Sequence, residues 1–517
     1  MDFFFLLPEL YILYTVLHCL LTISKFDWQQ SRSAFVISKH EITSIILTRT
    51  LENLHICLVL VASLFLYNAV DTVLYIEFNE DATLFSNNHH FISDGYTLLF
   101  KFMLIFSTRL LLQASIDYLL QHPRSIMEFA ILTQLFIFFL SILISANDLV
   151  LSFIAVVGFS LSTYVLILTD SSQHNTREAA IKYYYLSALS SGMLAFGIWL
   201  CYLLFNSTNF VEIEWILQLW KITDHFTKIN HLGLLSACIY FILFGFLFKL
   251  AAFPCHLWAA DVYEGSPQTI LAFFVIPIKI SVLGFIFRIF IFTFKDLIFL
   301  WHPIFMLSAI TSMVGGAFYA LVEKRIRKFL AYSSISQMGF LLSGITYGTI
   351  QCLTAAIIFL IIYIIMNLGL FIILLNTTNK KDNRPLLYIT DLQFFTENNA
   401  LYSILLTVIL FSMAGIPPLA GFFGKYFLFL TIFQAKGYLL VICGLFSSVI
   451  SAYYYLRIIK WLWFEQKNEK EENLQFIVEM SQGLQDILII IAVLLVFYIS
   501  LLNNWLYTMI DSLLWIN

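Results

Sequence analysis

Four lysines lie inside long apolar runs of this 517-residue chain: Lys182, Lys249, Lys279 and Lys425. A primary amine that loses hydration in an apolar environment can gain or release a proton near neutral pH. Insertion scales put the cost of a charged lysine at mid-membrane depth at roughly 3 kcal/mol, so such residues persist where they line a polar path. The chemistry that these residues favour is proton transfer inside a membrane.

Composition places the chain in a bilayer. Hydrophobic residues make up 60% of the chain and charged residues 12%, whereas soluble domains carry about 25% charged residues. The formal net charge of −4 gives no indication of nucleic-acid binding, so no nucleic-acid partner is expected. Seven cysteines are scattered singly without a CxxC pair, so no metal, iron–sulfur or disulfide pattern is visible.

Apolar runs of about 20 residues predict an all-α polytopic membrane protein with about fourteen transmembrane helices. Residues 1–23 lack the basic region and cleavage site of a signal peptide, so we expect a retained first helix. The predicted spans lie near 3–23, 54–76, 95–116, 126–145, 149–169, 178–205, 231–257, 268–293, 301–320, 329–349, 352–376, 400–435, 437–463 and 485–508.

Lysine and arginine concentrate in alternate loops, at residues 25–49, 324–328 and 380–384, whereas residues 77–81 are acidic. By the positive-inside rule, the basic loops face the matrix or cytoplasm. An even number of spans then puts both termini on the opposite side. The heavy use of Phe and Tyr, at 53 and 26 residues, suits an AT-rich organellar genome.

Two predicted spans contain helix-breaking residues. In the seventh, Pro254 and His256 follow Lys249, and the long twelfth span contains Gly415-Ile-Pro-Pro418 before Lys425. Proline removes a helix donor and clashes with the preceding turn, so both spans should break. Broken helices at membrane depth are tolerated where they border protein or a water-filled cavity.

The two breaks lie five spans apart, an odd offset that reverses direction in the membrane and indicates inverted repeats. We therefore expect a chain in four segments. These are an N-terminal three-helix segment (1–120), a first five-helix repeat with helices 4–8 (121–296), an inverted second repeat with helices 9–13 (297–464), and a polar loop with helix 14 (465–517).

Depth separates the four lysines. Lys249 and Lys279 flank a turn at 264–267. Lys249 lies eleven residues before Ala260 and Lys279 twelve residues after Pro267; at about 1.5 Å per residue each segment rises roughly 16–18 Å, about half of a roughly 30 Å core. Structural lysines bonded to buried carbonyls are the competing interpretation for both, and a snorkelling lysine competes for Lys425. Lys182 follows Glu178 by four residues, so an interfacial ion pair competes there.

Two further polar residues have open interpretations. His256 adjoins the seventh-span break and could link a half-channel to bulk water or cap a helix end. Lys101 lies in the third span, and we favour a structural role for it.

Three sequence strings carry a family resemblance: FKLAAFPCHLWAADVYEGSP at 248–267, KFLAYSSISQMGF at 328–340 and SMAGIPPLAGFFGK at 412–425. With them the chain resembles the antiporter-like subunits of respiratory complex I. Within that family it is most similar to the group formed by subunit 2 of NADH:ubiquinone oxidoreductase, the bacterial N subunit and the chloroplast B subunit. The resemblance covers about residues 3 to 463.

The resemblance implies a proton-translocating membrane-arm subunit without its own redox centre. Lys182, Lys249, Lys279 and Lys425 match the family's lysines of spans 6, 7, 8 and 12. FMN, iron–sulfur clusters and ubiquinone are expected in other subunits, and the expected partners are other membrane-arm subunits, including neighbouring antiporter-like ones, and lipids. The implied location is the mitochondrial inner membrane, with both termini on the intermembrane-space side.

The chain departs from the family pattern at two places. Family members usually have a glutamate in span 5, where this chain places Val157, or Val156 or Gly158 with slippage. Either Glu128, Asp148 or Glu178 substitutes as the partner of Lys182, or the switching pair is lost. The second departure is Gln337, where span 10 usually has a histidine; glutamine can orient water but cannot titrate.

Two other functions compete with this interpretation. A cation/proton antiporter subunit of the multisubunit sodium/proton type shares these helices, and membership of an NADH-oxidising complex distinguishes the two. A structural membrane-arm subunit that has lost pumping is consistent with the missing span 5 glutamate.

Overall fold

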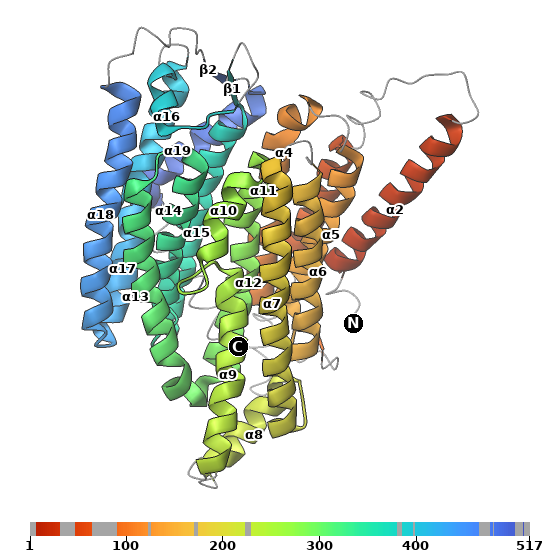
Figure 1. Cartoon of the computed structure of the whole chain (residues 1–517), viewed down its shortest axis with the longest axis vertical. Coiled ribbons are helices and arrows are strands. Elements are labelled where there is room, and N and C mark those ends of the chain that lie inside the picture. Colours follow the sequence, from red (N-terminus) through yellow and green to blue (C-terminus); the bar gives the residue numbers. More distant parts are fainter. Residues whose placement is uncertain are drawn as a thin grey trace, which may run out of the picture.

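The computed structural model describes residues 7–30, 47–64, 90–121, 126–169, 174–222, 229–379, 385–395, 399–464, 476–478, 480–501 and 510. Helices dominate these ranges (Figure 1). The N-terminal part contains α2 (Leu7–Gln30), a helix over Leu47–Leu64, α4 (Gly95–Gln121), α5 (Ile126–Ser145), α6 (Leu149–Leu168), α7 (His174–Phe205) and α8 (Phe210–Ile222). The central part contains α9 (Ile229–Lys249), α10 (Leu257–Gly265), α11 (Gln268–Val275), α12 (Pro277–Arg288), η3 (Ile289–Thr293) and η4 (Lys295–Leu297).

The remaining helices follow in the second half of the chain. They are α13 (Ile298–Val322), α14 (Ile326–Ser343), α15 (Ile350–Leu375), η5 (Ile389–Phe394), α16 (Ala400–Ala414), α17 (Ala420–Gln434), α18 (Tyr438–Trp463) and α19 (Gln482–Leu501). One small antiparallel sheet pairs β1 (Thr377–Asn379) with β2 (Phe476–Val478). The prediction of an all-α protein missed this sheet and the short helix α8.

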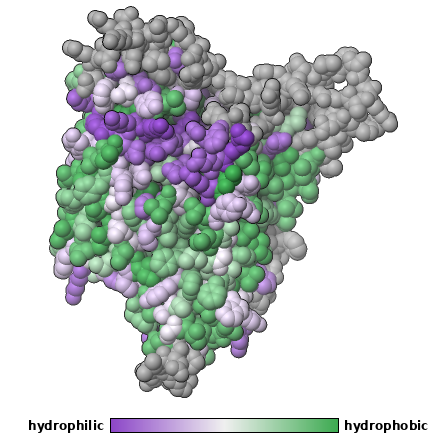
Figure 2. Space-filling model, viewed as in Figure 1, coloured by the Kyte–Doolittle hydropathy of each residue, from purple (hydrophilic) through white to green (hydrophobic). Residues whose placement is uncertain are grey.

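Every predicted span overlaps a helix in the described part of the chain. Among the described residues, 10 helices are long and apolar enough to cross a membrane, and Ala400–Ala414 and Gln482–Val496 are shorter apolar helices. The chain is therefore a multi-pass membrane protein, while the number fourteen, the orientation and the segment boundaries stay predictions. Figure 2 agrees, because apolar side chains cover the visible side of the bundle and hydrophilic ones gather towards one end.

Both predicted breaks are present. Residues 250–256 are not helical and separate α9 from α10, and residues 415–419 separate α16 from α17. The depth count for Lys249 assumed an unbroken helix to residue 260, so that assumption was wrong. A third break was not predicted: at Ile276 the eighth span divides into α11 and α12, because Pro277 has no N–H to donate to the preceding turn.

The centre of the molecule is formed by α11, α12 and α15. Every residue of α11 and α12 is buried. Arg327 on α14 donates to the carbonyl oxygens of Glu264 (3.2 Å) and Ser266 (3.0 Å) at the end of α10. The two predicted repeats therefore share a core and are joined by hydrogen bonds between α14 and the end of α10.

Candidate functional site

Lys249 is the last residue of α9 and lies at the first break. Its side chain is buried, and Nζ donates to Ser187 Oγ on α7 at 2.6 Å. The ammonium also lies 5.6 Å from the centre of the Phe159 ring on α6. A cation at the C-terminal end of a helix is favoured by the unpaired carbonyls there. The helix end at the break and the Ser187 hydroxyl group thus provide polar groups for Lys249 in an otherwise apolar interior.

His256 stands at the N-cap position of α10, but its side chain makes no capping hydrogen bond. Its ring stacks on Phe253 with centroids 3.4 Å apart, and Nδ1 lies 3.3 Å from the carbonyl oxygen of Pro254. His256 therefore occupies the helix-end position that one of the two sequence interpretations gave it, but its side chain makes no capping bond. A role in linking Lys249 to bulk water stays a prediction.

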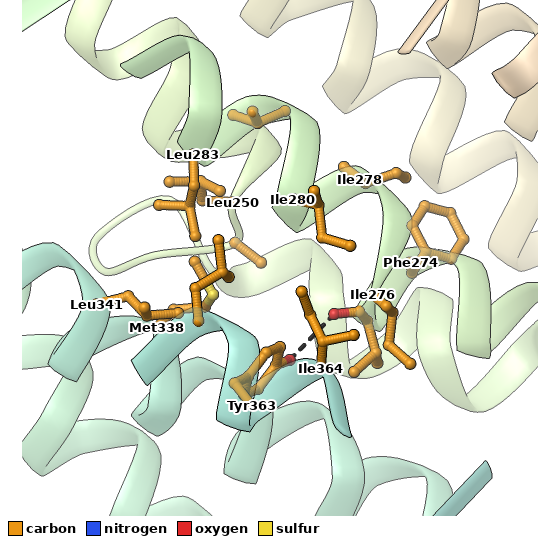
Figure 3. Packing of buried hydrophobic residues seen from close by; sticks show 14 of the residues in the cluster. Leu250, Phe274, Ile276, Ile278, Ile280, Leu283, Met338, Leu341, Tyr363 and Ile364 are labelled. Carbon is orange, nitrogen blue, oxygen red and sulfur yellow. Dashed lines mark hydrogen bonds between the residues drawn. The ribbon is translucent and has the colours of Figure 1, made fainter. Parts of the chain in front are cut away.

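Lys279 is the third residue of α12, just beyond the unpredicted break. Its side chain is buried, and Nζ donates to the carbonyl oxygen of Ser334 (3.4 Å) and to the Tyr363 hydroxyl (3.3 Å). The Tyr363 hydroxyl in turn donates to the carbonyl oxygen of Val275 at 3.0 Å, a bond drawn in Figure 3. The acceptors of Lys279 belong to α14 and α15, so this lysine connects the two predicted repeats.

Lys425 on α17 is buried against the end of α16. Nζ donates to the carbonyl oxygens of Met413 (3.3 Å) and Ala414 (3.4 Å), the last residues of that half-helix. It also lies 5.1 Å from the centre of the Phe340 ring on α14. Gly415 has φ +82°, and a Cβ there would lie 3.3 Å from Nζ, so glycine permits this close approach.

The three buried lysines share one property: within the described ranges, none forms an ion pair with a carboxylate. Their acceptors are hydroxyl groups and backbone carbonyls. A buried carboxylate would fix the ammonium in its charged form. Neutral acceptors allow each amine to exist with or without its extra proton.

Lys182 differs from the other three. Nζ lies 2.8 Å from Glu178 Oε1 and 2.9 Å from Asp261 Oδ2, and 42% of the side chain is exposed. The predicted contact with Glu178 is confirmed, whereas Asp261 on α10 was missed as a partner. The interfacial ion pair that competed with a path role for Lys182 is thus present on a partly exposed side chain.

The other carboxylates that were candidates for the Lys182 partner lie elsewhere. Glu128 is exposed in the first turn of α5. Asp148 caps α6 by accepting from the Val150 amide (2.9 Å) and lies 3.1 Å from His90 Nδ1. Neither forms an ion pair with Lys182, so both substitutions for the missing span 5 glutamate are wrong.

Gln337 lies on α14 between the residue that contacts Lys279 and the residue that contacts Lys425. On α14 it is three residues from Ser334, which contacts Lys279, and three from Phe340, which contacts Lys425. Each step of three residues rises about 4.5 Å and turns about 60° in the same sense. The Gln337 side chain is buried and interacts with the hydroxyl group of Tyr455 on α18.

The apolar helices, the breaks and the buried lysines define the class of this molecule as a multi-pass membrane protein with broken helices at charged sites. The family model described as NADH:quinone oxidoreductase/Mrp antiporter, transmembrane, matches residues 146–451. The chain belongs to this family, and the resemblance seen in the sequence is confirmed.

Relatives and a solved structure agree with this assignment. NADH-quinone oxidoreductase subunit N of Pelagibacter ubique is 36% identical over 386 residues, which cover 75% of this chain and 79% of that protein. NADH-ubiquinone oxidoreductase chain 2 of Marchantia polymorpha is 37% identical over 384 residues, covering 74% and 76%. A chain of respiratory complex I from Thermus thermophilus with bound aureothin has the same fold, with a TM-score of 0.73, 22% identity and coverage of 97% and 98%.

Proposed function

We propose that this chain is a proton-translocating subunit in the membrane arm of an NADH–quinone oxidoreductase. Protons pass along Lys249, Lys279 and Lys425, driven by redox chemistry in other subunits. Lys182, with Glu178 and Asp261, responds to charge rearrangement and alters the proton affinity of Lys249 through α7. His256 is the proposed link from Lys249 to bulk water.

The observation that carries this proposal is the absence of carboxylate partners at the three buried lysines of the described chain. A lysine whose role is structural gains most from a fixed opposite charge, as Lys101 does with Glu9. Lysines that bind only hydroxyl and carbonyl oxygens keep both protonation states accessible. Lys279 and Lys425 do bond to buried carbonyls, as the structural interpretation also expects. The position of all three lysines at helix breaks is what supports transfer over a purely structural role.

The packing of the helices supports a route between the lysines. Helix α12, which carries Lys279, packs against α9, which ends at Lys249. Helix α14 contacts Lys279 through Ser334 and Lys425 through Phe340, and Gln337 lies midway between these two residues along the helix. Glutamine has no titratable group, so a proton crosses this stretch through water that the amide orients.

The proposed function also implies cofactors in other subunits, partner subunits and a location. The chain itself takes no part in electron transfer, and FMN, iron–sulfur clusters and ubiquinone act in other subunits. Its partners are neighbouring membrane-arm subunits and lipids. Its location is the mitochondrial inner membrane, with both termini towards the intermembrane space.

The test is Lys249→Met in the assembled complex reconstituted into vesicles. We expect fewer protons translocated per NADH oxidised, because methionine fills the site without binding a proton. An unchanged ratio of protons to electrons overturns the central role of Lys249. The control is the double variant Lys101→Met with Glu9→Leu, which removes a buried lysine and its partner away from the proposed path and should leave the ratio unchanged.

A cation/proton antiporter subunit is the second candidate, because the matching family model includes Mrp antiporters. Purification from the native membrane distinguishes the two: co-purification with NADH dehydrogenase activity supports the proposal, and its absence supports the antiporter. A structural subunit without pumping is the third candidate, since residues 156–158 contain no carboxylate. An unchanged proton-to-electron ratio after neutralising both Lys279 and Lys425 favours that function.

A further inference from the structure

The hydroxyl group of Tyr363 lies where the Lys279 side chain meets the break between α11 and α12. It contacts Lys279 Nζ at 3.3 Å and donates to the Val275 carbonyl at 3.0 Å. Tyr363 is buried on α15, and Figure 3 shows its ring reaching from that helix towards the backbone beside Ile276. The hydroxyl thus bonds both a titratable amine and a backbone group of the break.

The Val275 carbonyl is the last one of α11 and receives this bond. In an unbroken helix it would accept from the Lys279 amide, four residues later. At the break, residue 276 is not helical, the Ile276 amide bonds to Ala272 and the Ile280 amide bonds to Ile276. Buried carbonyls require a donor, and the phenol supplies one to Val275 at this interruption.

Two side-chain hydrogen bonds attach α11 to α15. At the start of α11, Gln268 Nε2 donates to the Leu374 carbonyl at 3.1 Å, and at its end Tyr363 donates to Val275. Gln268 bonds to a backbone carbonyl and to no lysine among the described residues. These two attachments differ in one respect: only the Tyr363 bond can respond to the charge of Lys279.

The response follows from the single proton of the hydroxyl group. Because the phenol donates to Val275, the lysine must be the donor in the contact between Nζ and the hydroxyl oxygen. When Lys279 passes its extra proton onward, the amine gains a lone pair that accepts hydrogen bonds. The amine and the Val275 carbonyl then compete for one phenolic proton, which stays on the tyrosine throughout.

We propose that Tyr363 is a positioning residue that couples the protonation state of Lys279 to the geometry of the α11–α12 break. With the amine charged, the phenol holds the Val275 carbonyl in its observed place. With the amine neutral, the phenol turns towards Nζ and the break rearranges to find another donor. This inference rests on the proposed proton path, and it assigns to that path a moving backbone element.

The experiment compares Tyr363→Phe with Lys279→Met in the assembled complex, measuring NADH oxidation and protons translocated per electron. Tyr363→Phe removes one oxygen atom and leaves Lys279 in place. We expect normal NADH oxidation with a proton-to-electron ratio as low as that of Lys279→Met. A Tyr363→Phe complex that pumps like the wild type, while Lys279→Met does not, overturns this inference and leaves the proposed path intact. Wild-type ratios in both variants overturn the path and the inference together.

Two matched controls separate coupling from packing. Tyr96→Phe removes another buried tyrosine bond to α12, from Tyr96 to the Gly284 carbonyl at 2.7 Å. Gln268→Met removes the other bond between α11 and α15. Both are expected to keep the wild-type ratio. A loss in either control as large as that in Tyr363→Phe overturns the inference, because general loosening then explains the effect.

Tyr363→His is the second variant if Tyr363→Phe does not assemble. The imidazole ring keeps one donor for Val275 and one acceptor for Nζ. We expect this complex to pump better than Lys279→Met. A ratio no better than that of Lys279→Met overturns the inference, since the two hydrogen bonds then do not carry the coupling.

Discussion

At the residue scale, the partners of the lysines separate two kinds of buried charge. Lys101 faces the carboxylate of Glu9, while Lys249, Lys279 and Lys425 face hydroxyl and carbonyl oxygens. A carboxylate partner holds an ammonium in the charged form, but neutral acceptors leave the proton exchangeable. The same residue type therefore has an ionic partner in one place and neutral partners in the others, where we propose that it carries protons.

Gln337 gives the first prediction at this scale. Gln337→Leu keeps the volume of the side chain and removes both groups that can orient water between Lys279 and Lys425. We expect the complex to assemble and oxidise NADH, with a lower proton-to-electron ratio. Gln337→His should retain pumping because imidazole also bonds water. Equal ratios in the leucine and wild-type complexes would exclude a role for the amide in the path.

The sequence predicted single residues better than their partners. Lysines in apolar runs are visible because their cost is independent of tertiary contacts. The pair Lys182–Glu178 was visible as well, because a spacing of four residues fixes the contact on one helix. Asp261 and Ser187 could not be assigned, since they reach their lysines from 79 and 62 residues away through the packing of different helices.

At the element scale, proline and glycine shape the sites. Pro254 and the pair Pro417–Pro418 predicted two breaks correctly, because a missing N–H acts locally. Pro277 has the same chemistry, yet its break was not predicted, since proline is also tolerated at the first position of a helix. In the structure Pro277 both interrupts the span and starts a new helix, because α11 ends at Val275 and α12 begins at Pro277.

Gly421 allows the two half-helices α16 and α17 to cross closely. A Cβ at this position would collide with the carbonyl oxygen of Ser412, whose Oγ accepts from the Gly421 amide at 3.2 Å. We expect Gly421→Ala to destabilise the chain by about 1–3 kcal/mol through overpacking and to lower the yield of assembled complex. Native gels and thermal denaturation of the complex measure this loss.

Gly192→Ala is the matched control for that prediction. Gly192 lies within α7, and a Cβ there meets nothing within 4 Å. Alanine should be neutral there or stabilise the helix by up to about 1 kcal/mol. If both alanine variants behave alike, the close crossing at Gly421 does not limit stability.

At the scale of the whole molecule, α4 attaches the N-terminal helices to the rest of the bundle. Lys101 on α4 pairs with Glu9 on α2, and Asp94 beside α4 pairs with Arg288 at the end of α12. Helix α2 otherwise runs at an angle away from the bundle (Figure 1) and packs mainly against α5. The sequence favoured a structural role for Lys101, and the ion pair agrees with that role.

This attachment yields the final prediction. Removing one partner of a buried ion pair leaves an unpaired charge, which typically costs about 3–5 kcal/mol, whereas replacing both by apolar residues is often nearly neutral. Lys101→Met alone should therefore lower the thermal stability of the assembled complex, and adding Glu9→Leu should restore most of it. Stability measured for both single variants and the double variant gives the coupling energy of the pair. Additive losses would mean that the two helices are held together by apolar packing, with no contribution from the ion pair.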